Sequence, residues 1–103
     1  MKTLTLPLKK EWFDLIKAGI KKEEYREINR YWVARLVAAM EPFTGTVLSF
    51  TDFDRLVFTL GYPKADDTER RLEFKNPKIR IGEGRPEWGA EPGKLYLVIT
   101  WEE

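Results

Sequence analysis

The sequence predicts a mostly β protein with some α structure, in which a small barrel carries two short helices near its N-terminus. Three observations lead to this prediction. The chain has 103 residues, which suits a single domain. Two segments within the first 40 residues space their apolar side chains as a helix does. The remainder holds short extended segments separated by turn residues, and a barrel is the simplest way to join them.

The first two elements are predicted from contrasting periodicities. Between Lys2 and Leu8 every second residue is leucine, the pattern of a half-buried strand, and Pro7 limits that strand near its end. Between Glu11 and Ala18 the apolar residues recur at helical spacing instead. Gly19 follows where a helix commonly ends in a left-handed residue. A strand and a short amphipathic helix are therefore expected here.

The next segment is dense in charge, and its pattern alone leaves helix and strand open. We choose a strand for Lys21 to Ile28, because Gly19 has just ended a helix and apolar residues sit among alternating charges. Asn29 then suits the N-cap of a second helix, predicted from Arg30 to Met40 by apolar residues at spacings of three and four. Pro42 stands just beyond its expected end.

The C-terminal part is predicted to hold the remaining strands. They are expected at Thr46–Phe50, Arg55–Leu60, Arg70–Lys75, Lys78–Ile81 and Leu95–Trp101. The last of these has apolar residues on both faces, which indicates an interior strand of the sheet. Residues 61–69 and 82–94 are rich in turn residues and are expected to form the long loops.

Composition excludes several kinds of chemistry. The chain has no Cys and no His, so a thiolate nucleophile, a disulfide framework and the commonest metal ligands are all missing. A formal net charge of +1 gives no global attraction to nucleic acid, although the first 40 residues are more basic than the rest. No apolar run is long enough to cross a bilayer, and we expect a cytoplasmic protein without membrane contact, cofactor or metal.

The segment from Gly19 to Arg26 carries the strongest chemical signal. If it contains a strand, Glu24 and Arg26 project from one face about 6 to 7 Å apart, and Lys21 lies where the preceding helix gives way to that strand. An arginine binds a phosphate or carboxylate, a glutamate accepts from a base amino group, and a desolvated lysine acts as a base. The alternative is a salt bridge that only orders one end of the fold.

These residues also resemble a known family. Gly19, Lys21, Glu24 and Arg26 fill the pattern G-x-K-x-x-E-x-R, which is similar to the signature of the ASCH domain, a branch of the PUA-like β-barrels. The stretch YREINRYWVARL and the later loop GRPEWGAEPGK look like those of small stand-alone bacterial and phage members. The resemblance covers nearly the whole chain and implies a single domain over residues 1–103. It implies a barrel of five to six strands with a cleft lined by the signature side chains.

The resemblance implies two kinds of function. The first is a module that binds RNA, single-stranded or looped, or a nucleotide-like ligand. The second is a hydrolase that acts on a modified nucleoside or on RNA, with Lys21 as general base and Glu24 as its proton partner. The deacetylating relatives use a threonine nucleophile where this chain has Glu24, so a water would have to replace that hydroxyl. A protein-interaction module using the acidic C-terminal part is a third possibility.

Aromatic residues complete the predicted binding site. Trp88 lies in the Gly- and Pro-rich loop, where it either plugs the barrel mouth or offers a platform on which a base stacks. Tyr62, after Gly61, is a weaker candidate of the same kind. The predicted ligand-binding residues are Gly19, Lys21, Glu24, Arg26, Tyr62 and Trp88. Five other aromatic residues fit apolar stripes and are assigned to the core: Trp12, Phe13, Trp32, Phe74 and Trp101.

Overall fold

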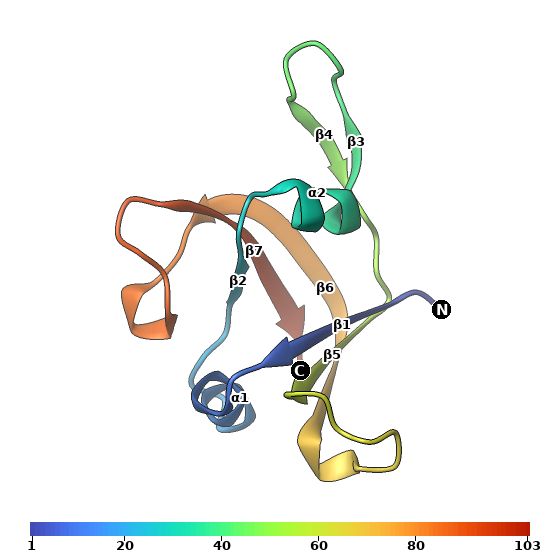
Figure 1. Cartoon of the computed structure of the whole chain (residues 1–103), viewed down its shortest axis with the longest axis vertical. Helices are drawn as coiled ribbons and strands as arrows, with labels where there is room; N and C mark the ends of the chain where they lie inside the picture. The colour runs from blue at the N-terminus through green and yellow to red at the C-terminus, as the bar shows by residue number, and fades with distance from the viewer.

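A computed structural model of the protein describes residues 1–103 and contains a mixed five-stranded sheet (Figure 1). The strands in spatial order are β1 (Thr3–Leu8), β5 (Arg55–Leu60), β6 (Arg71–Glu83), β7 (Leu95–Glu102) and β2 (Glu24–Arg26). The β1–β5 pair is parallel and every other neighbouring pair is antiparallel. As predicted, β7 is an interior strand, with β6 on one side and β2 on the other.

The sheet has two open edges, β1 and β2, and is therefore not closed into a barrel by backbone pairing. The α+β class predicted from the sequence is confirmed, whereas the closed barrel is not. A proline is tolerated in β1 because this strand lies at an edge, where one row of backbone groups has no strand partner. The carbonyl of Pro7 accepts a hydrogen bond from the Arg26 side chain at 3.0 Å, so a side chain of β2 joins the two edges.

The second predicted helix is only partly correct. Helix α1 (Lys10–Lys17) matches its prediction within one residue, but α2 (Arg30–Leu36) ends four residues early. The chain continues as β3 (Val37–Met40), which pairs with β4 (Val47–Phe50) in a separate hairpin. Figure 1 shows this hairpin extending away from the main sheet beyond α2. Backbone pairing with β4 overrides the helical spacing of the apolar residues in this segment.

Two strand predictions also need correction. The strand expected over Lys21 to Ile28 is limited to the three residues of β2, because β7 pairs only with those three. The two strands expected on either side of Asn76 and Pro77 are one continuous strand, β6. Its register shifts between Lys75 and Lys78, and Asn76 has a positive φ of 47°, so a bulge accommodates the proline without ending the strand. Short 3-10 helices occupy Thr68–Arg70 and Pro86–Trp88.

The hydrophobic core lies between the sheet and the two helices. The alternating leucines of β1 are buried, together with Phe13 and Ile16 of α1, and Phe74 and Trp101 pack against this cluster. Burial of each such side chain contributes roughly 1.5 to 3 kcal/mol to folding. The core therefore fixes α1 against β1 and β5, and with it the turn that leads into β2. No helix of the structure has the length and apolar character that spanning a membrane requires.

Candidate functional site

Three residues of the predicted constellation form one buried ion-pair cluster. Glu24 is 6% exposed and uses both carboxylate oxygens: Oε1 accepts from Nζ of Lys21 at 2.7 Å, and Oε2 accepts from Nη2 of Arg26 at 2.8 Å. Lys21 is 1% exposed, and its ammonium lies 5.1 Å from the ring centre of Trp12 and 5.2 Å from that of Tyr25. Such aromatic faces attract a cation and exclude water from it.

The turn after α1 explains how Lys21 reaches this buried position. Gly19 has a φ of +75°, a conformation that glycine adopts without steric cost. Its N–H donates to the carbonyl of Ile16, while the N–H groups of Ile20 and Lys21 both donate to the carbonyl of Leu15. This arrangement is the Schellman motif, which reverses the chain at a helix C-terminus. Gly19 therefore contributes to the site by directing Lys21 beneath Trp12 and Tyr25.

Burial and charge act in opposite directions on the pKa of Lys21. Desolvation is the largest effect and lowers the pKa below the ordinary value of 10.5, and the nearby Arg26 lowers it further. The ion pair and hydrogen bond with Glu24 raise it, but do not compensate fully. The amine of Lys21 thus loses its proton more readily than an exposed lysine does.

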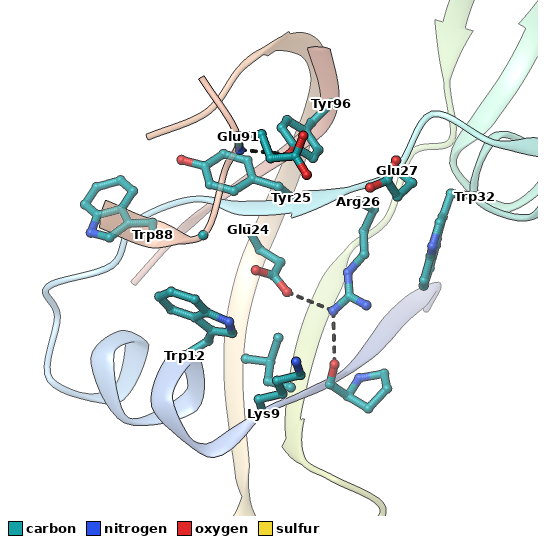
Figure 2. A pocket seen from close by; sticks show the side chains of 13 residues that line it. Lys9, Trp12, Glu24, Tyr25, Arg26, Glu27, Trp32, Trp88, Glu91 and Tyr96 are labelled. Carbon is teal, nitrogen blue, oxygen red and sulfur yellow. Dashed lines mark hydrogen bonds and ion pairs between the residues drawn. The ribbon is translucent and has the colours of Figure 1, made fainter. Parts of the chain in front are cut away.

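A pocket of about 470 Å³ opens beside this cluster, and we call it the aromatic pocket (Figure 2). Five aromatic side chains line it: Trp12, Tyr25, Trp32, Trp88 and Tyr96. Glu24 and Arg26 face the same space, and Figure 2 shows them between the rings of Trp12 and Trp32. Flat apolar walls around a carboxylate and a guanidinium suit a planar ligand that both donates and accepts hydrogen bonds.

The loop that carries Trp88 is held against the sheet by two tyrosine hydroxyls. The Tyr25 hydroxyl accepts from the backbone N–H of Arg85 at 2.9 Å, and the Tyr96 hydroxyl accepts from that of Glu91 at 2.9 Å. Between these points the chain passes close to α1, where a Cβ added to Gly89 would lie 2.9 Å from the Trp12 ring. The position of Trp88 is thereby fixed relative to β2, β7 and α1.

The structure brings together some of the predicted binding residues and separates others. Glu24, Arg26 and Trp88 line the aromatic pocket. Lys21 lies behind Glu24 and is not exposed to the pocket, and Gly19 lies in the turn that positions it. Tyr62, which is 92% exposed, lies outside the aromatic pocket and lines two neighbouring hollows.

Sequence reasoning missed most of the aromatic wall. The apolar stripe of α1 predicts Trp12 in the core, but Trp12 is half-buried and belongs to neither buried cluster. Trp32 packs partly against the core and also lines the pocket. Tyr96 is on the face of β7 opposite to Leu97. The apolar character of this second face is the only feature of the sequence that could have pointed to Tyr96 as a pocket residue. The periodicity of an element shows which side chains avoid water, not which of them border a pocket.

Comparisons of the chain with models of known families, with curated proteins and with solved structures found no match. The arrangement of Asp and Glu side chains offers no group of three or more that could hold a metal ion. The groups at this site that can act on a ligand are those of the ion-pair cluster and the aromatic pocket.

Proposed function

We propose that the protein binds the base of a nucleotide or of single-stranded or looped RNA in the aromatic pocket, and that it is a member of the ASCH branch of PUA-like proteins. The observation that carries the proposal is the set of five aromatic side chains around the Glu24–Arg26 pair. Stacking of a base on an aromatic ring contributes about 1 to 3 kcal/mol and does not depend on a specific sequence.

The polar groups of the pocket complement a base edge. Both hydrogen bonds that Arg26 makes to the protein come from Nη2, which leaves the Nη1 donors for a base carbonyl or ring nitrogen. The carboxylate of Glu24 accepts from an exocyclic amino group, since each of its oxygens has more than one lone-pair direction. Lys21 has a positioning role in this proposal, because its ammonium donates to Glu24 from the side away from the pocket.

A titration of labelled single-stranded RNA tests the proposal, with fluorescence anisotropy as the readout. Replacement of Trp88 by alanine removes one wall of the pocket, and we expect at least tenfold weaker binding, equivalent to about 1.4 kcal/mol. Phe43→Ala is the matched control, because Phe43 is 93% exposed at the hairpin tip and lines none of these walls. Equal affinity of the wild type and the Trp88 variant would contradict the proposal.

A second candidate is a hydrolase that acts on a modified nucleoside or on RNA. The lowered pKa of Lys21 favours it, because a buried amine that releases its proton readily is suited to act as a base. Glu24 contacts both Lys21 and the pocket, so a proton from a bound water would have to pass through this carboxylate.

Product analysis separates the two candidates. Wild-type protein is incubated with N-acetylated cytidine or with RNA, and the products are separated by chromatography. If the protein is a hydrolase, the wild type forms product and Glu24→Gln abolishes turnover. If it only binds, no product forms with any of the variants.

A further inference from the structure

A second hollow of about 520 Å³ lies next to the aromatic pocket, and its lining has a different charge. Three arginines line it, Arg26, Arg35 and Arg71, so we call it the arginine pocket. No acidic residue is among its walls, whereas the aromatic pocket has three, Glu24, Glu27 and Glu91, against two basic residues. The two spaces therefore differ in the sign of the charge that each attracts.

The two hollows share part of their walls. Pro7, Arg26 and Trp32 line both of them, so one ligand can occupy both spaces and contact Arg26 along the way. The Arg26 guanidinium lies 4.9 Å from the ring centre of Trp32, which orients it at this boundary. In Figure 2, Arg26 lies between Glu24 on one side and Trp32 on the other.

The other two arginines are not neutralised by the protein. Arg35 donates to the hydroxyl of Tyr31 and lies against the rings of Tyr31 and Trp32, but has no carboxylate within 4 Å. The Arg71 guanidinium donates hydrogen bonds from Nη2 to the carbonyl oxygens of Pro63 and Lys64, at 3.4 and 3.3 Å. Its buried Nε has no hydrogen-bond partner. Two positive charges thus converge on one hollow without a protein anion to balance them.

Exposed aromatic rings border this cationic hollow. Tyr62, from the loop after β5, and Tyr31, from α2, both line it and are 92% and 59% exposed. Arginine forks bind phosphate oxygens in pairs, and flanking rings offer surfaces for the next base. This combination is typical of the path of a single nucleic acid strand rather than of a pocket for a neutral metabolite.

From this we infer that the arginine pocket binds the phosphate of a nucleotide or RNA strand whose base lies in the aromatic pocket. This inference rests on the proposed function and adds the class of ligand, which is a phosphorylated nucleoside and not a free nucleoside or base. It also assigns a role to Tyr62, whose exposed ring lies where a neighbouring nucleotide would pass.

The test compares nucleosides with their phosphates by isothermal titration calorimetry at low salt. The probes are adenosine, cytidine, guanosine and uridine, their 5′- and 3′-monophosphates, and inorganic phosphate alone. We expect the preferred monophosphate to bind at least about tenfold more tightly than its nucleoside, because charge-assisted hydrogen bonds form with the arginines. Inorganic phosphate, without a base, is expected to bind more weakly than either.

Variants locate the phosphate. Arg71→Gln and Arg35→Gln are each expected to reduce the preference for the monophosphate to less than about threefold, while the affinity for the nucleoside stays within twofold. Arg30→Gln, on the same helix as Arg35 but outside both pockets, is the matched control and should leave the preference unchanged. Arg35 is exposed on its helix, so its variant is informative even if Arg71→Gln fails to fold.

The outcomes separate this inference from the function on which it rests. If nucleosides and monophosphates bind the wild type equally, the aromatic pocket binds bases but the phosphate site is wrong. A preference that persists in both arginine variants would also overturn the inference, because the phosphate would then bind elsewhere. If no probe binds at all, the proposed function fails and the inference fails with it.

Discussion

At the scale of single residues, Glu24 balances two cations that have little access to water. Glu24→Gln leaves Lys21 buried between two aromatic rings without its ion-pair partner, and loss of one partner from such a cluster costs about 3 to 5 kcal/mol. Lys21→Met should cost less, because Glu24 keeps its ion pair with Arg26 and the methionine fills the apolar space between the rings. Urea denaturation at neutral pH measures the free energy of unfolding of both variants. If Lys21→Met loses as much stability as Glu24→Gln or more, Glu24 is not the residue that balances the two cations.

The pH dependence of stability follows from the same burial. The pKa of Lys21 is lower in the folded protein than in the unfolded chain, so the unfolded chain binds this proton more tightly. The cost of burying the ammonium is therefore fully present below the lowered pKa, and it is relieved as the pH rises from there toward 10.5. In Glu24→Gln, the pH range over which this cost is relieved should extend to lower pH, because the main group that raises the pKa of Lys21 is gone.

Tyr25 titrates in the opposite sense. Burial, assisted by Glu23, raises the pKa of its hydroxyl to about 12. The folded state thus retains this proton, and the resulting stabilisation is complete below pH 10.0 and lost as the pH rises through about 12. The chain has four tyrosines, and a spectroscopic pH titration follows their conversion to tyrosinate. We expect Tyr25→Phe to lack the absorbance change that occurs near pH 12 in the wild type. Circular dichroism over the same range checks that the fold persists, and a missing component near pH 10 would contradict the prediction.

At the scale of elements, the loop after β6 depends on a close approach at Gly89. This residue has a φ of +100°, and an added Cβ would lie 2.9 Å from the Trp12 ring. We expect Gly89→Ala to destabilise the protein by about 1 to 3 kcal/mol through backbone strain, and to weaken ligand binding because Trp88 shifts with the loop. Gly93→Ala is the matched control: its φ is +78°, but nothing lies within 4 Å of its added Cβ.

Unfolding and RNA titrations of the two glycine variants distinguish strain from displacement of the loop. Both variants carry the cost of a positive φ, whereas only Gly89→Ala contacts the wall of the aromatic pocket. If both lose the same stability and neither loses affinity, the contact between Gly89 and Trp12 does not position Trp88.

Some elements can be predicted from the sequence and others cannot, for reasons that the structure shows. The sequence predicts strand β5 and helix α1 almost to the residue, because a glycine follows each of them and the apolar residues of α1 recur at a clear helical spacing. The end of α2 was wrong because pairing between β3 and β4, a contact with a later segment, decides the conformation of Val37 to Met40. At the site, the pattern around Glu24 and Arg26 predicted a cluster, but the five rings around it come from four elements and one loop that no local pattern connects.

At the scale of the whole molecule, the open sheet and the site are related. The edges β1 and β2 have no shared hydrogen-bond ladder, and Arg26 spans the space between them to reach Pro7. The aromatic pocket and the arginine pocket both have Pro7 and Arg26 in their walls, so they lie where a closed barrel would have its last pair of strands. The backbone groups of an unpaired strand edge need polar partners. Here the Arg26 side chain is the partner of the Pro7 carbonyl, and the space beside it remains open to a ligand.

The net charge of +1 predicts how RNA binding should respond to salt. With so little net positive charge, we expect the electrostatic attraction to come mainly from the arginine pocket, and one or two phosphates to bind there. For single strands each neutralised phosphate contributes about −0.7 to the slope of log affinity against log salt, so one or two phosphates give an expected slope between about −0.7 and about −1.4. Titrations of RNAs of increasing length between low and moderate salt measure this slope. A steeper slope that grows with length would place the binding on an extended surface instead of in the two pockets, because every added phosphate would then release counterions.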